Sequence, residues 1–160
     1  MDVPNRKINR LQNYNYSQNG AYFVTICTKD KQCIFGEVVP VGAGIDRPKM
    51  ELSNIGKIVE GCINEVSKIY KNVNVDKFVI MPNHMHMIIE INGCGRSMPA
   101  PTVSSIICQL KSVSSKQAGI VIWQKGFYDH IIRNQNDYDS IWNYIDTNPD
   151  KWLEDEYYKV

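Results

Sequence analysis

Apolar residues recur at helical spacing in three parts of the chain. Between residues 51 and 70, and again from Val103 to a stop at Gly119, they lie three or four positions apart and so share one face of an α-helix. The two stripes consist of Ile55, Ile58, Val59, Cys62, Ile63, Val66 and Ile69, and of Val103, Ile106, Ile107, Leu110 and Val113. A third stripe lies within residues 136–148 and ends at Pro149, which cannot continue a helix. The spacing therefore predicts three amphipathic helices.

Short runs rich in β-branched and aromatic residues predict four strands, over residues 21–28, 75–81, 85–91 and 128–133. Pro82 and Asn83 indicate a turn between the second and third strands. Residues 38–49 and 92–101 are rich in Pro and Gly and predict loops, and the residues near 35 and 51 could add an edge hairpin.

The order strand, helix, strand, strand, helix, strand, helix predicts an α+β fold. Specifically, we expect a ferredoxin-like or RRM-like sheet built from a split β-α-β unit, with antiparallel strands and two helices on one face. The third helix would be an addition at the C-terminal end.

Two of the three histidines lie in one predicted strand, as His84 and His86. Because side chains in a strand alternate between faces, both histidines and Glu90 point one way, while Met85, Met87, Ile89 and Ile91 point to the core. Two imidazoles at this spacing can share one metal ion. The pair is equally explained by a structural pair of hydrogen-bonded histidines.

Tyr144 and Asn148 lie on the third predicted helix, away from the centre of its apolar stripe. They are four residues apart and so share one face. The pattern fits a small polar site, but it also fits a half-exposed surface tyrosine and an asparagine that ends the helix before a proline.

Composition narrows the class of protein. The chain has 160 residues, of which 43% are hydrophobic, so we expect one domain over residues 1–160. No apolar run approaches the roughly 20 residues of a membrane helix, so we expect a cytoplasmic protein without membrane contact. The five cysteines form no Cys-x-x-Cys pair, which favours reduced thiols.

The net charge of the chain is only +1, so any surface that binds an anionic partner must be a local patch of positive charge. Residues 1–13 form a basic arm with Arg6, Lys7 and Arg10, whereas residues 150–160 are acidic. Further candidates for phosphate contacts are Lys111, Lys125 and Arg133, in a stretch that is also compatible with an ordinary solvated surface.

Three blocks in order carry a resemblance to a known family: FVIMPNHMHMIIEI (residues 78–91), WQKGFYDHIIRNQNDY (residues 123–138) and IWNYIDTNP (residues 141–149). The chain resembles the single-tyrosine HUH transposases of insertion sequences, and among them most of all the REP-associated tyrosine transposases. The family's His-hydrophobic-His motif matches His84, Met85 and His86. Its Tyr-x-x-x-Asn-Pro helix matches Tyr144, Asn148 and Pro149.

The resemblance implies that Tyr144 is a catalytic nucleophile and that His84, His86 and Asn148 hold a divalent metal ion, Mg²⁺ or Mn²⁺. It implies a transposase-like endonuclease and strand transferase that acts on single-stranded hairpin DNA through a 5′-phosphotyrosine. His130 and Glu90 are candidates for an auxiliary role, and a homodimer is a further expectation. The sequence leaves open two other functions: a domesticated hairpin-binding protein with little cleavage, and a metal-dependent hydrolase in which water is the nucleophile.

Overall fold

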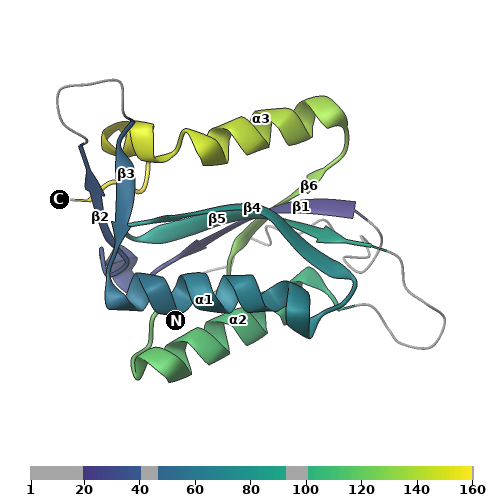
Figure 1. Cartoon of the computed structure of the whole chain (residues 1–160), viewed down its shortest axis with the longest axis horizontal. Helices are drawn as coiled ribbons and strands as arrows, with labels where there is room; N and C mark the ends of the chain where they lie inside the picture. The colour runs from purple at the N-terminus through teal and green to yellow at the C-terminus, as the bar shows by residue number, and fades with distance from the viewer. Residues whose placement is uncertain (1–19, 41–46, 93–100, 160) are drawn as a thin grey trace, which may run out of the picture.

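A four-stranded antiparallel sheet forms the centre of the molecule (Figure 1). The computed structural model describes residues 20–40, 47–92 and 101–159. The sheet contains β1 (Gly20–Cys27), β4 (Val73–Met81), β5 (His84–Ile91) and β6 (Tyr128–Ile132), in the spatial order β4-β5-β1-β6. Neighbouring strands are antiparallel throughout. A split β-α-β chain produces this order, so the predicted ferredoxin-like fold is confirmed.

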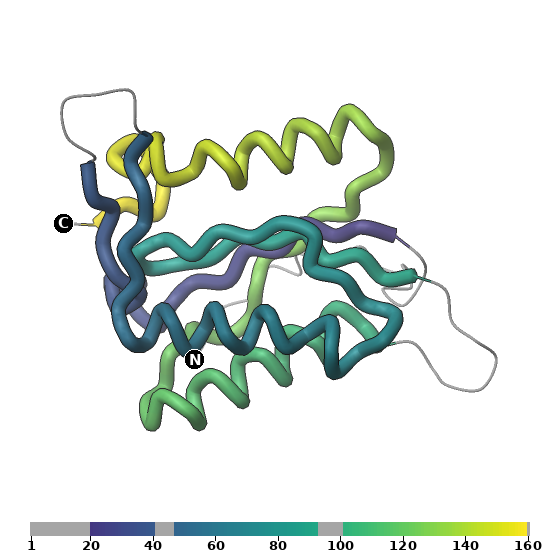
Figure 2. The backbone as a smooth tube through the Cα atoms, in the orientation of Figure 1, coloured from purple at the N-terminus to yellow at the C-terminus, as the bar shows by residue number. Residues whose placement is uncertain are grey.

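Helices cover both faces of the sheet (Figures 1 and 2). α1 (Asn54–Ile69) and α2 (Val103–Ala118) pack side by side on one face, whereas α3 (Gln135–Asp146) crosses the opposite face. α1 begins where the Ser53 hydroxyl accepts a hydrogen bond from the Gly56 backbone N–H, and α2 ends at Gly119 in the left-handed conformation, at φ 71°. The two predicted helices on one face and the additional C-terminal helix are therefore all present.

The alternation along β5 separates two apolar clusters. Met85, Met87, Ile89 and Ile91 are fully buried in the main core, among the apolar faces of α1 and α2. On the other face, Ile88 packs with Phe23 and Ile145 beneath α3. His84 and His86 share this second face, as the strand pattern predicts.

A short hairpin lies beside the sheet, formed by β2 (Gly36–Val39) and β3 (Lys49–Leu52). Gly36 has a φ of 135°, and a Cβ atom built there would lie 2.0 Å from the carbonyl oxygen of Glu51. Only glycine allows this close approach of the two backbones. The predicted edge hairpin therefore exists. Its strands include residues 38, 39 and 49, at the two ends of the segment that was predicted to be a loop.

Two short 3₁₀ helices were not predicted: η1 (Lys29–Lys31) after β1 and η2 (Pro149–Glu154) after α3. Asn148, expected inside the third helix, lies just beyond the end of α3 but keeps helical dihedral angles, at φ −58° and ψ −43°. Pro149 then begins η2, because proline is well suited to the first position of a helical turn.

The predicted basic arm of residues 1–13, with Arg6, Lys7 and Arg10, lies outside the described residues, as does most of the predicted loop 92–101. Within the described ranges, no helix has the length and apolar character needed to cross a membrane.

Candidate active site

The rings of His84 and His86 meet at the start of β5, on the face covered by α3. Their side chains are 0% and 1% exposed, and the ring centroids are 4.7 Å apart. The strand alternation that sends the intervening Met85 into the main core brings the two imidazoles together. The pair is therefore a buried polar cluster in an otherwise apolar sheet.

Each histidine is oriented through its Nδ1 atom. His84 Nδ1 lies 2.8 Å from Oδ1 of Asn83, and because an amide oxygen can only accept, His84 donates through Nδ1. His86 Nδ1 lies 2.7 Å from the hydroxyl of Thr25, its partner across the β1–β5 ladder. Both Nε2 atoms are buried and make no hydrogen bond. At His84, the lone pair of Nε2 is thus left available for a ligand.

Burial keeps both imidazoles neutral. It lowers the pKa of His84 to about 3, and it also lowers the pKa of His86 well below the ordinary value of 6.5. A neutral imidazole is the form that binds a metal ion.

Tyr144 and Asn148 reach the histidines from the end of α3. The Tyr144 ring lies 5.2 Å from that of His86, and the side chain is 41% exposed. Burial is the main influence that raises the pKa of the Tyr144 hydroxyl, and the amide of Asn148 lowers it. The same amide raises the pKa of His84, although burial has the larger effect and lowers it. Asn148 therefore lies beside both Tyr144 and His84. Its Oδ1 atom is buried without a hydrogen bond.

The segment after Pro149 contributes residues that the sequence analysis did not single out. The Asp155 side chain is 5% exposed, and its Oδ2 lies 3.7 Å from His84 Nε2. Tyr157 packs its ring 4.5 Å from that of His84, and its carbonyl oxygen accepts a hydrogen bond of 2.6 Å from Asn83. Residues 150–159 thus fold over the histidines. The one sequence signal for this packing is Trp152, an aromatic residue in an acidic stretch, which is 8% exposed.

The remaining candidates lie away from the two Nε2 atoms. Glu90 is six residues from His84 along β5, where its carboxylate accepts a hydrogen bond from Asn74. His130 pairs with Asp137 at 2.9 Å, which joins β6 to the first turn of α3. These contacts give both side chains structural partners away from the histidines.

The three basic candidates that the structure describes occupy different places. Lys111 donates to the carbonyl oxygens of Gln124 and Gly126, and so supports the loop before β6. Lys125 is exposed on that loop. Arg133 follows β6 at the end paired with Ala21, far along the sheet from the histidines.

The donor set fits a divalent cation. His84, His86 and Asp155 offer ligand atoms within 4.8 Å of one another, and Asn148 adds a buried amide oxygen without a partner. Two imidazole nitrogens with carboxylate and amide oxygens form a mixed set, of the kind that suits Mn²⁺ or Mg²⁺. The structure therefore contains a possible metal-binding group at this position.

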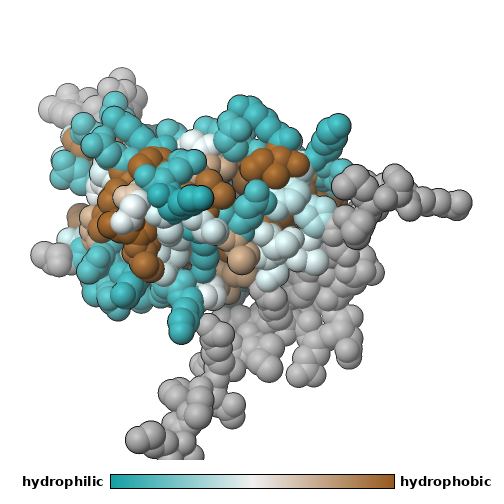
Figure 3. Space-filling view, turned by 90° about the horizontal axis from the view of Figure 1, so that it is seen from below, coloured by the Kyte–Doolittle hydropathy of each residue, from teal (hydrophilic) through white to brown (hydrophobic). Residues whose placement is uncertain are grey.

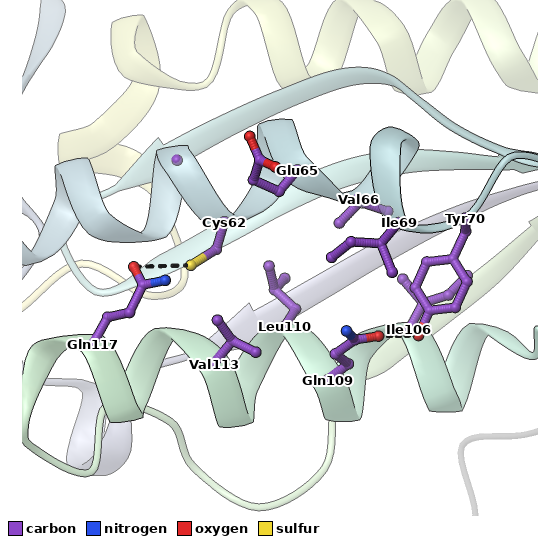
Figure 4. A pocket seen from close by; sticks show the side chains of 11 residues that line it. Cys62, Glu65, Val66, Ile69, Tyr70, Ile106, Gln109, Leu110, Val113 and Gln117 are labelled. Carbon is purple, nitrogen blue, oxygen red and sulfur yellow. Dashed lines mark hydrogen bonds between the residues drawn. The ribbon is translucent and has the colours of Figure 1, made fainter.

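A separate groove lies on the opposite side of the sheet, between α1 and α2. Its volume is about 360 Å³, and hydrogen bonds from Cys62 to Gln117 and from Tyr70 to Gln109 span it (Figure 4). From this side, apolar patches stand among hydrophilic side chains (Figure 3). The sheet separates this groove from the histidines.

Comparison with other sequences identifies a relative of unknown activity. No family model matches the chain. An uncharacterized protein of Haemophilus influenzae strain Rd is 35% identical in an alignment of 177 positions, which covers 98% of this chain and 94% of that protein.

Comparison with solved structures identifies the fold. A REP-associated tyrosine transposase bound to a REP hairpin aligns with a TM-score of 0.64 and 22% identity, over 89% of this chain and 73% of that chain. A Deinococcus radiodurans R1 protein proposed to be a transposase aligns over 86% of this chain and 97% of that one, but its TM-score of 0.49 and identity of 10% are too low to support an inference. The chain therefore belongs to one family with the Haemophilus influenzae protein, and it has the fold of a REP-associated tyrosine transposase, the type of single-tyrosine HUH transposase that its motifs resemble.

Proposed function

We propose that this protein is a metal-dependent endonuclease and strand transferase of single-stranded hairpin DNA, with Tyr144 as its nucleophile. The observation that carries the proposal is the position of Tyr144, 5.2 Å from the His86 ring and beside buried ligand atoms that make no hydrogen bonds. At 41% exposure, this tyrosine is accessible to a substrate, while the ligand atoms stay shielded from water.

The reaction begins with attack of the Tyr144 hydroxyl oxygen on the phosphorus of a phosphodiester. The new bond joins this oxygen to phosphorus, and the bond from phosphorus to the 3′ oxygen of the leaving strand breaks. Overall, the phenol proton ends on that 3′ oxygen, and the 5′ end of the other strand stays linked to the protein. Attack by a second 3′-hydroxyl reverses the step and joins strands without ATP, because the linkage keeps the energy of the phosphodiester bond.

His84, His86, Asn148 and Asp155 are the residues that would hold the divalent cation, Mg²⁺ or Mn²⁺. When bound, the cation supplies positive charge beside the scissile phosphate and favours the phenolate form of a nearby tyrosine. Such help is needed here, because burial raises the pKa of the Tyr144 hydroxyl above its ordinary value of 10.

Support for hairpin DNA as the substrate comes from the structural comparison. The transposase that shares this fold was solved bound to a REP hairpin, and the alignment covers 89% of this chain. The match of Tyr144, Asn148 and Pro149 to the family's helix motif supports the same substrate class.

A second candidate function is hairpin binding with little cleavage. The observation in its favour is that Asp155 and Tyr157 cover the histidines, whose side chains are 0% and 1% exposed. A substrate phosphate can reach the ligand atoms only if residues 155–157 move.

Covalent capture tests the proposal. The protein is mixed with a labelled pool of single-stranded hairpins and Mn²⁺ and then run on a denaturing gel. We expect a DNA-linked band that disappears with a chelator and in Tyr144→Phe. Tyr70→Phe is the matched control, because it removes a hydroxyl on the opposite side of the sheet.

The other outcomes separate the competing functions. Hairpins that bind but never become linked would support the binding protein. Free cleaved strands produced by Tyr144→Phe would mean that water is the nucleophile.

A further inference from the structure

A lysine-lined hollow of about 630 Å³ lies beside the candidate active site. Four lysines from three separate segments of the chain line it: Lys29, Lys31, Lys125 and Lys159. We call it the lysine hollow. Asp30 is the one acidic residue among the residues that line it. The hollow therefore carries a strong positive charge in a chain whose net charge is only +1.

The lysine hollow adjoins the histidines through shared hydrogen bonds. Asn83, which orients His84, donates to the carbonyl oxygen of Lys31 at 3.3 Å. The ammonium group of Lys31 lies 5.3 Å from the centre of the Tyr157 ring, which itself packs on His84. The hollow thus lies next to the His84 side of the candidate site, whose other histidine contacts Tyr144.

Strained backbone holds one of the lysines, Lys31, in place. Asp30 and Lys31 have φ values of 56° and 52°, the left-handed region that residues other than glycine rarely adopt. The Lys31 backbone N–H donates to the carbonyl oxygen of Thr28, and its own carbonyl oxygen accepts from Asn83. Strain of this kind persists where the surroundings enforce it, and it is common at functional sites.

The charges of these lysines are not neutralised locally. Among the residues that the structure describes, none of the four forms an ion pair. Lys159 donates instead to the backbone carbonyl oxygen of Asp30, at 2.9 Å, which keeps its positive charge at the rim. Several unpaired ammonium groups around one hollow favour an anionic ligand with more than one charge.

We propose that the lysine hollow binds successive phosphates of single-stranded DNA next to the phosphodiester that Tyr144 attacks, an inference that rests on the function proposed above. The hollow also offers apolar surface, because Val121, which lines it, is 70% exposed. Sugars and unpaired bases can pack against such surface.

The test measures binding without cleavage. Three lysines are changed together, in Lys29→Gln/Lys125→Gln/Lys159→Gln, on a Tyr144→Phe background without metal. Lys31 is kept because it adjoins Tyr157. The matched control is Lys57→Gln/Lys68→Gln/Lys71→Gln, three exposed lysines in α1 and the turn after it. The probe is fluorescent oligothymidylate of about 15 nucleotides, and its anisotropy is followed across a salt titration.

The hollow variant should bind the probe at least about tenfold more weakly at low salt, and its salt slope should be shallower by about 2, since each lost contact to single-stranded DNA removes about 0.7. The control should keep the affinity and slope of its Tyr144→Phe parent, and thermal unfolding should show that both variants fold.

An unchanged affinity and slope in the hollow variant would overturn the inference. Displacement of the probe by inorganic phosphate, at concentrations too low to act through ionic strength, would also overturn it. The hollow would then be a site for small anions. Neither result depends on covalent capture, so a failure here is separate from a failure of the proposed function.

Discussion

At the scale of single residues, Asn83 connects the parts of the candidate site. Its amide oxygen accepts from His84, and its amide nitrogen donates to the carbonyl oxygens of Tyr157 and Lys31. The side chain is completely buried. This arrangement orients the His84 ring, so that its free Nε2 faces the other ligand atoms.

Asn83→Ala should therefore weaken Mn²⁺ binding by about 10- to 100-fold, because partners that orient a ligating histidine contribute on that scale. Isothermal titration calorimetry with Mn²⁺ measures the change. Asn74→Ala is the control, since Asn74 bonds to Glu90 near the other end of β5. Equal Mn²⁺ affinity in a folded Asn83→Ala protein would show that this hydrogen bond does not prepare the site.

The sequence predicted the residues whose positions follow a regular period. His84 and His86 share a face because strands alternate, and Tyr144 lies one turn before Asn148 because helices repeat every 3.6 residues. Asp155 and Tyr157 lie in the irregular segment that follows η2, where spacing carries no directional information. Asn83 was identified as a turn residue only, because two of its side-chain hydrogen bonds, to Lys31 and Tyr157, join segments that are far apart in the sequence.

At the scale of elements, an ionic cluster attaches the end of α3 to the sheet. Lys77 of β4 lies 2.8 Å from the Asp146 carboxylate and 4.0 Å from the centre of the Trp142 ring. Arg47 pairs with both Asp146 and Asp150. Trp142 and Asp146 lie on either side of Tyr144 in α3, so their contacts fix the position of Tyr144 relative to the histidines.

Asp146→Asn should slow formation of the covalent DNA adduct several-fold while the protein stays folded, because α3 would lose charged partners on β4 and at Arg47. Single-turnover rates at saturating DNA measure the effect. Asp139→Asn is the control on the same helix, where the carboxylate bonds only to the nearby Gln135 among the described residues. Identical rates for Asp146→Asn and the unaltered protein would show that the ionic cluster does not position Tyr144.

Gly36→Ala should destabilise the protein by about 2 kcal/mol or more, because φ is 135° and the new Cβ would lie 2.0 Å from the Glu51 carbonyl oxygen. Gly61→Ala is the opposite case: it lies inside α1 with nothing within 4 Å, so alanine should stabilise by about 0.5–1 kcal/mol. Urea denaturation gives both values. If Gly36→Ala were as stable as the unaltered protein, the hairpin geometry would be wrong.

The long elements were predictable because each has an amphipathic period. Both ends of α2 also carry clear signals, with a reciprocal cap between Thr102 and Ser105 and a left-handed Gly119. The β2–β3 hairpin was expected only as an option, since its strands have four residues each and a turn-rich segment separates them. Burial of β5 on both faces was not expected, because the covering of its second face depends on how α3 and residues 150–159 pack.

At the scale of the whole molecule, one chain supplies all the candidate catalytic residues. The Tyr144 ring lies 5.2 Å from His86 of the same chain, and Asp155 lies 3.7 Å from His84. No second chain is needed to complete the site. The homodimer expected from the family resemblance stays a prediction, which light scattering can test.

Mixing two inactive proteins tests this arrangement. We expect no covalent adduct from an equimolar mixture of His84→Ala and Tyr144→Phe, because neither chain then contains a complete site. Tyr70→Phe mixed with either variant should still form the adduct through its own intact site. Adduct formation in the first mixture would show that Tyr144 acts in the site of a partner chain.

The proposed function requires that Tyr144 form a covalent bond to the 5′ end of cleaved DNA. The most direct measurement is mass spectrometry of protein recovered from a reaction with hairpin DNA and Mn²⁺, followed by mapping of the modified peptide. We expect the intact mass to increase by that of the 5′-phosphorylated fragment and the attachment to map to Tyr144. Attachment to Tyr157, a tyrosine whose ring lies close to both histidines, or cleaved DNA without any modified peptide, would contradict this mechanism.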